Sequence, residues 1–346
     1  AGPVWRVIHL TGYKDGIARL HFAFHHLIID VVSWRIISED MQTLLTGGTL
    51  LGKGSSYRQW VHAVTNYAIG HSQEKQYWRS VLSDYVPLIG KNEAKNQLLV
   101  LSPEWTDILL HNANQGYNTE INDLLLSALT IALTKALGNP VNHVFMEGHG
   151  REAIDETVDM STTVGWFTTV YPVRLKNEAD VETTIIETKE MLRGIPFKGL
   201  GCGALLGDEV TGLSRIGFNY LGQIDSGSGT DTNQIWQIVS EDAGRMIHPE
   251  NKDNLVINIT GMVQNGKLHV SIVSTLSSVQ TENFKKALET ALISVIKQGQ
   301  LMAASGGVKT PSDYGLKETS ITHLNRLKAK FNGVSKSEER ENILEI

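Results

Sequence analysis

The chain has 346 residues, of which 41% are hydrophobic and 20% charged, which suits one large domain or two medium ones with buried cores. A net charge of −6 without a Lys/Arg cluster argues against nucleic-acid binding, and the absence of an 18-residue apolar run argues against a membrane span. The single cysteine, Cys202, excludes an intrachain disulfide and favours a reducing, cytoplasmic location.

The first elements predicted are a β-hairpin and two helices. Residues 4–10 and 17–24 are β-rich runs separated by a turn signal at residues 14–16. Apolar residues then recur at helical spacing. We expect helices at residues 32–45 and 57–82, the second with a candidate break at residues 70–72.

Strands and helices alternate through the rest of the chain. Strands are expected at residues 97–101, 141–146, 164–175, 254–262 and 267–275. Helices are expected at residues 120–137, capped by Thr119 and ended by Gly138, and at residues 281–297. Asn265 and Gly266 form the strongest hairpin signal. The expected class is therefore α/β with mixed sheets, close to α+β.

Polar segments suggest where the chain divides. Residues 89–96 are a plausible boundary between lobes, so we expect an amino-terminal unit at residues 1–92 and a second unit at residues 93–316. Residues 317–346 are charged and are interpreted as a linker toward another module. We interpret both termini as cuts through a longer polypeptide.

A pair of histidines marks the end of the second predicted strand. His25 and His26 are followed four residues later by Asp30. Neighbouring strand residues point to opposite faces, so only one of the imidazoles can face a cleft. An imidazole takes or gives a proton near neutral pH, which suits general acid–base catalysis. Zinc binding is disfavoured because adjacent histidines point apart. Taken alone, the pattern leaves a catalytic and a structural histidine pair both open.

Four further patterns accompany the histidines. Ser33 and Trp34 follow Asp30 at short distance, and residues 147–152 carry Glu147, His149, Arg151 and Glu152. The other two runs are residues 164–169, which include Trp166, and residues 218–223, which include Asn219 and Tyr220.

In this order, the motifs resemble the signature set of epimerization domains of nonribosomal peptide synthetases, in the condensation superfamily. Residues 123–128, 196–203 and 310–314 are similar to further motifs of that family. The sequence departs from the family at Val31, where a glycine is usual, and at Cys202, where a tyrosine is usual. The family's opening Pro-Ile-Gln motif is absent, so the resemblance implies an incomplete amino-terminal lobe, with an exposed sheet edge or apolar patch and aggregation.

The resemblance implies a two-lobed fold of the chloramphenicol-acetyltransferase type with its site in the cleft between the lobes. It implies an isomerase of antibiotic biosynthesis that converts an L residue to D while the residue is held as an aminoacyl or peptidyl thioester. The thioester sits on a peptidyl carrier protein, whose phosphopantetheine arm is the only prosthetic group, so no intrinsic cofactor and no metal are expected. A following condensation domain is a second expected partner.

The resemblance also assigns roles to residues. His26 and Glu147 are expected to face each other as the acid–base pair. Asn219 and Tyr220 are candidates for polarising the thioester or moving a proton, or else for fixing a strand. Asp30 is expected to be structural and paired with Arg151 or Arg174. The remaining site residues are expected to support the cleft: His25 as a packed, hydrogen-bonded core residue, Trp34 and Trp166 as core or cleft-wall aromatics, and Ser33, His149 and Arg151 beside them.

Three other functions remain open. A condensation domain shares the histidine motif and joins two carrier-bound acyl groups. A degenerate domain would only dock a partner. A free-standing acetyltransferase would use coenzyme A. Cys202 is not favoured as a nucleophile because no base adjoins it in the sequence, and the glycines at 199, 201 and 203 lack the setting of a phosphate loop.

Overall fold

A computed structural model describes residues 2–316 and 319–331, apart from residues 212, 214, 224–240, 243, 245–246, 249 and 252–253. These residues form a two-stranded and a six-stranded sheet. The first sheet pairs β1 (Trp5–Leu10) with β2 (Arg19–Phe24) as an antiparallel hairpin, as predicted. The second has the order β3-β8-β7-β6-β4-β5. Its strands are β3 (Lys95–Val100), β4 (Val141–Gly148), β5 (Thr169–Lys176), β6 (Arg215–Gln223), β7 (Leu255–Gln264) and β8 (Lys267–Ser274).

The six-stranded sheet is mixed. β6 runs parallel to both β4 and β7, and the other neighbours are antiparallel. β7 and β8 form the hairpin predicted at Asn265 and Gly266, where both residues have positive φ. Parallel and antiparallel neighbours occur in one sheet, which confirms the predicted α/β class with mixed sheets.

Helices precede, separate and follow these strands along the chain. They are α1 (Val31–Leu45), α2 (Tyr57–Gly70), α3 (Glu74–Val81), α4 (Pro103–His111), α5 (Ile121–Leu137), α6 (Val181–Arg193), α7 (Leu200–Leu206), α8 (Asp208–Thr211), α9 (Ser278–Ala304) and α10 (Ile321–Phe331), with short 3₁₀ turns η1 (His26–Ile28), η2 (Ala113–Gly116), η3 (Pro196–Gly199) and η4 (Pro311–Tyr314). The predicted break at residues 70–72 separates α2 from α3. In the described part of the chain, no helix has the length and apolarity needed to cross a membrane.

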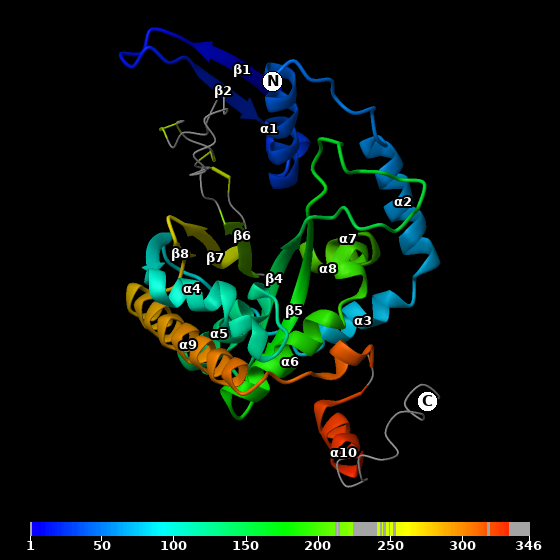
Figure 1. Cartoon of the computed structure of the whole chain (residues 1–346), viewed down its shortest axis with the longest axis vertical. Helices are drawn as coiled ribbons and strands as arrows, with labels where there is room; N and C mark the ends of the chain where they lie inside the picture. The colour runs from blue at the N-terminus through cyan, green and yellow to red at the C-terminus, as the bar shows by residue number, and fades with distance from the viewer. Residues whose placement is uncertain are drawn as a thin grey trace.

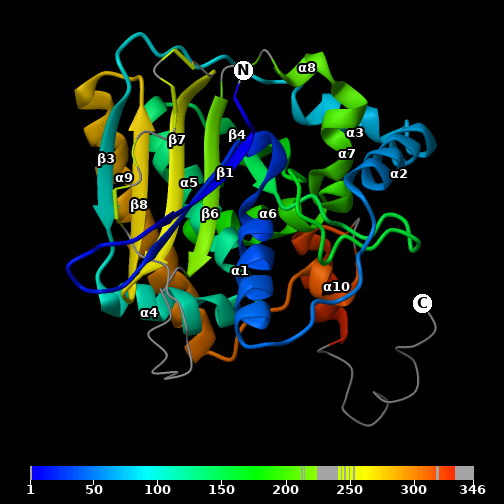
Figure 2. The ribbon, with the colours of Figure 1, turned by 90° about the horizontal axis from the view of Figure 1, so that it is seen from above.

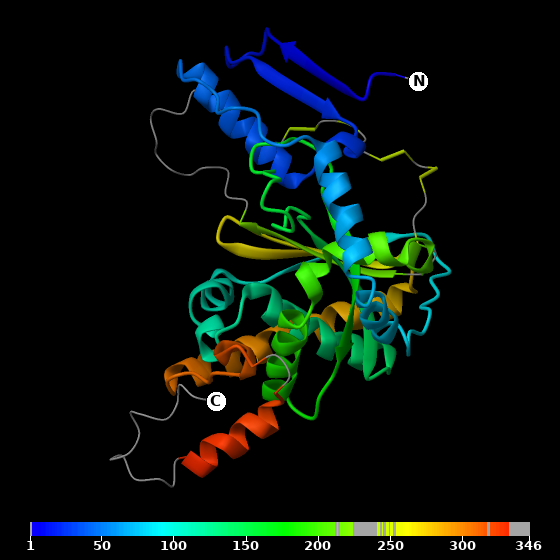
Figure 3. The same cartoon turned by 90° about the vertical axis from the view of Figure 1, so that its right-hand side faces the viewer.

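The elements lie in layers (Figure 1, Figure 3). α5, α6 and α9 cover one face of the six-stranded sheet, where alternate residues of β7, such as Ile257 and Ile259, are buried. The β1–β2 hairpin and α1 lie on the other side of the sheet. Burial of alternate strand residues against apolar helix faces accounts for this core, since successive strand residues point to opposite faces.

The division at residue 92 stays a prediction. α3 lies before that boundary, yet its residue Trp78 is fully buried in the same core as the six-stranded sheet. Glu74 accepts a hydrogen bond from Trp78 Nε1 at 2.7 Å and another from the Tyr67 hydroxyl at 2.5 Å, so a buried carboxylate joins α2 to α3.

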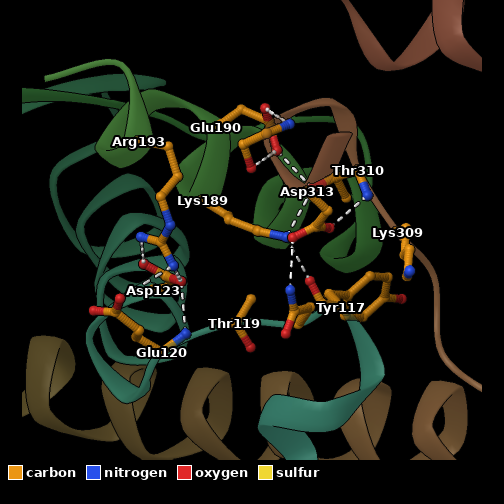
Figure 4. A network of polar contacts seen from close by, with 12 residues as sticks. Tyr117, Thr119, Glu120, Asp123, Lys189, Glu190, Arg193, Lys309, Thr310 and Asp313 are labelled. Atoms are coloured by element: carbon orange, nitrogen blue, oxygen red, sulfur yellow. Dashed lines mark hydrogen bonds and ion pairs between the residues drawn. The ribbon is translucent and has the colours of Figure 1, made fainter. Parts of the chain in front are cut away.

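A buried polar network holds the turn η4 and the preceding Thr310 against α6 (Figure 4). The Lys189 ammonium donates to Oδ2 of Asp313 at 2.7 Å, to Oγ1 of Thr310 at 2.8 Å and to the carbonyl of Tyr117 at 2.8 Å. Its neighbour Glu190 accepts from the hydroxyl of Thr310 at 2.6 Å. Because all three ammonium donors have partners, the buried charge is compensated.

Two local predictions are wrong. The strand expected at residues 164–175 begins only at Thr169, because the N–H groups of Gly165 and Phe167 donate to side chains of another segment and not to a neighbouring strand. Thr119 does not cap the following helix. Glu120 is the N-cap, and its N–H donates to Oδ2 of Asp123 at 2.8 Å.

The hairpin exposes apolar surface, as predicted. Every residue of β1 is exposed. Trp5 is 56% exposed, and Val7 and Ile8 are more than two-fifths exposed. Among the described residues β1 pairs only with β2, so its other edge offers unpaired backbone groups.

Candidate active site

The histidine motif lies where the hairpin leads into α1. β2 ends at Phe24, His25 caps the turn η1, and His26 is the first residue of that turn. Nδ1 of His25 accepts the N–H of Leu27 at 3.1 Å, while its side chain is exposed. The prediction that His25 is hydrogen-bonded is confirmed and the prediction that it is a core residue is wrong, because His25 caps a short turn that has no buried residue.

His26 stands against an aromatic wall. Its side chain is exposed, and its ring meets Trp166 edge-on with centroids 5.3 Å apart. Trp166 is 38% exposed and comes from the loop that follows β4. This position fits the predicted cleft-wall role of Trp166 and fixes one side of the imidazole.

Asp30 ties the histidine segment to that loop. It is the N-cap of α1 and accepts the N–H of Ser33 at 2.7 Å. Across the molecule it accepts the N–H of Phe167 at 3.1 Å and pairs with the guanidinium of Arg151 at 3.1 Å. Although burial acts to raise the pKa of Asp30, these hydrogen bonds and the Arg151 charge hold it below the ordinary value. The structural role predicted for Asp30 therefore has a clear basis.

Arg151 also joins the start of α1 to the loop after β4. Its guanidinium donates to the carbonyls of Met160 and Thr163 at 2.8 and 2.7 Å and to Oγ of Ser33 at 3.0 Å, and lies over the ring of Phe167. Of the two partners predicted for Asp30, Arg151 is therefore the correct one. Arg174 pairs with Asp84 at 2.7 Å.

Ser33 is buried and contacts the same loop through its hydroxyl. That hydroxyl donates to the carbonyl of Gly165 at 3.0 Å and accepts the N–H of Gly165 at 3.1 Å. We name Asp30, Ser33 and Arg151, with the backbone of Gly165 and Phe167, the cleft bridge. It joins the start of α1, four residues after His26, to the loop after β4 through mostly buried hydrogen bonds.

Glu147 is the acidic partner that the resemblance predicts for His26. It lies at the end of β4, and its Oε2 accepts Nδ2 of Asn219 on β6 at 2.8 Å. The side chain is open to solvent, yet protein atoms crowd it enough to raise the pKa of its carboxyl. A positive charge on His26 would oppose that rise in the pKa of Glu147.

Tyr220 lies on the other face of the sheet. Adjacent strand residues point in opposite directions, so Asn219 faces Glu147 while Tyr220 packs against the helix-side core. A Cβ added to Gly261 would lie 3.3 Å from the Tyr220 ring, and the Tyr220 hydroxyl is buried without a hydrogen-bond partner among the described residues. The prediction that Tyr220 polarises the thioester is not supported by this position, whereas the strand-fixing alternative is.

Trp34 and His149 support the neighbourhood. Trp34 meets Phe22 and Phe24 edge-on, at 6.4 and 5.3 Å between centroids, and so joins α1 to the hairpin. His149 is exposed, with its Nε2 3.0 Å from Glu152 Oε1 and its Nδ1 accepting the N–H of Arg151. His149 thereby shapes the loop that carries Arg151.

The structure shows how the chain accommodates its two departures from the family pattern, at Val31 and Cys202. Val31 is the first residue of α1 and does not have positive φ, so glycine is not needed for this turn. Cys202 is fully buried, and that burial raises the pKa of its thiol to about 12. A thiol of this kind is protonated at neutral pH and cannot serve as a nucleophile.

Sequence reasoning missed the aromatic residues of α2 that hold the loop after β4. The hydroxyl of Tyr57 donates to the carbonyl of Trp166 at 2.9 Å, and Nε1 of Trp60 donates to the carbonyl of Gly150 at 2.9 Å. Their helical spacing indicated a packed face, and nothing in the sequence showed that their polar ends reach a distant loop. Among the described residues, no group of three or more His, Cys, Asp or Glu side chains could hold a metal ion.

Comparison with known families decides the assignment. A family model described as "Condensation domain" matches residues 1–311. The chain belongs to the condensation-domain family. This condensation-family chain is 34% identical over 300 residues to N-(5-amino-5-carboxypentanoyl)-L-cysteinyl-D-valine synthase of Amycolatopsis lactamdurans, with 84% of the chain and 8% of that protein covered. It is 35% identical over 356 residues to bacitracin synthase 3 of Bacillus licheniformis, with 94% of the chain and 6% of that protein covered.

Solved structures agree with the family. The epimerization domain from the third module of tyrocidine synthetase B superposes with a TM-score of 0.75 at 28% identity, covering 87% of this chain and 73% of that one. The condensation enzyme VibH superposes with a TM-score of 0.59 at 15% identity, covering 80% and 68%, and shows the shared fold alone. The condensation-family chain spans less than a tenth of the length of the curated relatives named above.

Proposed function

We propose that this domain epimerizes an aminoacyl or peptidyl thioester, converting an L residue to D while a carrier protein holds it. The observation that supports the proposal is that the fold carries two proton-handling side chains on separate elements, His26 on the turn η1 and Glu147 at the end of β4, with the Glu147 carboxylate held by Asn219. Inversion at one carbon needs proton transfer on two faces, and two groups on separate elements suit that need.

The proposed reaction balances without an oxidant or a reductant. One of the two residues removes the Cα proton, and the electron pair of the broken C–H bond moves into the thioester carbonyl to give an enolate. The other residue then delivers a proton to the opposite face of Cα, and the carbonyl reforms. The raised pKa of Glu147 suits a group that must both accept and release a proton, while the Asn219 hydrogen bond keeps its carboxylate oriented.

The partners follow from the same proposal. The thioester arrives on the phosphopantetheine arm of a peptidyl carrier protein, so the domain itself needs no cofactor. A condensation domain would then use the D residue. Two similarities support inversion: one relative is named for a product that contains D-valine, and one structural neighbour is an epimerization domain.

Condensation is the second candidate function, favoured by the description of the family model. In that case His26 would assist attack of an amine from a second carrier on the thioester, and Glu147 would not be required. The two functions therefore differ in whether the Cα proton exchanges with solvent.

The test measures deuterium incorporation at Cα of an L-residue thioester on a carrier protein in D₂O, using the full chain. We expect exchange and a growing D fraction with the wild type, and a loss of about a hundredfold or more for His26→Ala and Glu147→Gln, the usual scale for a general acid or base. The exposed His9→Ala and Glu289→Gln variants are the matched controls and should leave the rate unchanged. Peptide-bond formation with a second loaded carrier, without exchange, would assign condensation instead.

A further inference from the structure

One peptide group next to His26 is held at both of its ends. The imidazole of His26 meets the Trp166 ring edge-on, with centroids 5.3 Å apart. In the peptide group that joins Trp166 to Phe167, the N–H of Phe167 donates to Oδ2 of Asp30 at 3.1 Å. The carbonyl of the same group, on Trp166, accepts the hydroxyl of Tyr57 at 2.9 Å. This peptide group is therefore bound both to the N-cap of α1 and to the first residue of α2.

The loop after β4 carries this peptide group between the two helices. Figure 1 and Figure 2 show the loop, in green, between α1 and α2. On the α1 side, Ser33 also holds the backbone of Gly165 by hydrogen bonds of 3.0 and 3.1 Å. Because a peptide group is planar, hydrogen bonds at both its N–H and its C=O fix its plane. They thereby fix the direction in which the Trp166 side chain leaves the backbone.

Tyr57 is well placed to hold that carbonyl. It is the first residue of α2, directly after a capping box that fixes the start of the helix. Its ring centroid lies 5.1 Å from that of Phe167 and 5.5 Å from that of Trp60. A Cβ added to Gly165 would lie 2.9 Å from Cδ2 of Tyr57, so the loop backbone lies directly against the ring. These contacts restrict the rotamer of Tyr57 and with it the position of the hydroxyl.

The Tyr57 hydroxyl keeps its proton at the pH of the proposed reaction. Burial and the negative charge of Asp30 raise the pKa of Tyr57 above its ordinary value of 10.0. A neutral phenol donates one hydrogen bond, which the carbonyl of Trp166 accepts. This contact therefore persists through the pH range in which an imidazole takes and gives a proton.

The orientation of Trp166 matters because His26 is exposed and is not held by a surrounding core. The edge-on contact with Trp166 limits the positions of the imidazole. We propose that Tyr57 is a positioning residue, which orients His26 through the peptide group after Trp166 and through the Trp166 ring. For its effect on the rate, this inference rests on the proposed function. A misplacement of about 1 Å at a reacting group can cost about a hundredfold in rate.

The test removes one hydroxyl and follows both the reaction and the imidazole. In Tyr57→Phe the ring remains, but the peptide group keeps only its hydrogen bond to Asp30 and can turn about it. We expect the kcat for Cα exchange to fall about tenfold, with the KM for the loaded carrier unchanged, because no group that binds the carrier is altered.

NMR reports the imidazole directly. The ring current of Trp166 displaces the signals of the His26 ring protons, which are identified by their loss in His26→Ala. In Tyr57→Phe these signals should move from their wild-type positions toward those in Trp166→Ala, where the ring current is absent. A role of Tyr57 in stability alone would not move them.

Tyr67→Phe is the matched control. It makes the same replacement on the same helix and removes a hydrogen bond to the buried Glu74, so it tests whether any weakening of α2 has the same effect. The His26 signals and the kcat should both keep their wild-type values in this variant.

Unmoved His26 signals or an unchanged kcat in Tyr57→Phe would overturn the inference, and so would equal changes in Tyr67→Phe. Each of these results would leave epimerization standing. Absence of Cα exchange in the wild type would overturn the proposed function, while the NMR comparison would still decide whether Tyr57 orients His26.

Discussion

At the scale of single residues, the site depends on what surrounds two ordinary side chains. His26 is held edge-on to Trp166, and Glu147 receives one hydrogen bond from Asn219. A donor to the charged form of a carboxylate stabilises that form, so Asn219 opposes the effect of burial on Glu147. Crowding by protein atoms raises the pKa of Glu147 and the charge of protonated His26 opposes that rise, and we expect the Asn219 hydrogen bond to act in the same direction as that charge.

Replacing Asn219 with alanine tests that balance. The loss of a donor to the carboxylate should raise the pKa of Glu147 further, so at a given pH less of the base is ionised. We expect the acidic limb of the pH–rate profile for Cα exchange to move to higher pH. On the acidic side of that limb, the variant should exchange about tenfold or more slowly than the wild type. The exposed Asn325→Ala on α10 should keep the wild-type profile, and an unmoved limb in Asn219→Ala would contradict the role given to this amide.

At the scale of elements, buried ion pairs hold together segments that are not joined by backbone hydrogen bonds between strands. The cleft bridge attaches the start of α1 to the loop after β4 through Asp30 and Arg151. Lys189 attaches η4 to α6 through Asp313. The side chains of both pairs are less than a tenth exposed, so removing one partner leaves a buried charge without compensation.

These pairs predict how stability depends on pH. The Arg151 charge and the Ser33 and Phe167 donors lower the pKa of Asp30, and Lys189 and the N–H of Thr310 lower that of Asp313, in each case against the opposing effect of burial. Because both folded-state values lie below the ordinary 3.8, the stabilisation is fully present above that pH and is lost as the pH falls through the lowered values.

The measurement is the free energy of unfolding by urea as a function of pH. At neutral pH, Asp30→Asn and Asp313→Asn should each lose about 3–5 kcal/mol, the usual cost of breaking a buried pair. The difference from the wild type should shrink as the pH falls below the ordinary carboxyl pKa. The exposed Asp107→Asn, whose side chain is 74% exposed, should lose less than about 1 kcal/mol at every pH. A pH-independent difference would contradict the linkage.

At the scale of the whole molecule, the hairpin is the part with the least cover. All six residues of β1 are exposed, and its apolar side chains gather near an unpaired edge. Strand edges of this kind pair with other chains unless they are charged or covered. Among the described residues, the main apolar core lies between the six-stranded sheet and the helices.

We therefore expect this chain to self-associate through the hairpin in solution. Trp5→Lys and Ile8→Lys place charges on that surface and should shift the mass measured by light scattering toward the monomer. Val279→Lys, on an exposed position of α9, is the matched control and should not change it. A monodisperse wild-type monomer with one cooperative melting transition would show that the exposed surface does not drive association.

The sequence by itself determined the local elements and the chemistry available to them. Turn residues such as Asn265 and Gly266 and the periodicity of residues 32–45 identified hairpins and helices, because turn geometry and apolar spacing are properties of short segments. The residues around His26 and Glu147 indicated proton transfer because the identity of each side chain, and with it its acid–base chemistry, can be read directly from the sequence.

Only the tertiary structure decided which of these side chains meet. It paired Asp30 with Arg151 and Arg174 with Asp84, and it put Asn219 beside Glu147 while turning Tyr220 toward the core. It also used the backbone of Gly165 and Phe167 for the cleft bridge, so that the expected strand began late. The physical reason is that strand order, register and backbone hydrogen bonds between distant segments depend on the packing of the whole chain, which no short stretch of sequence contains.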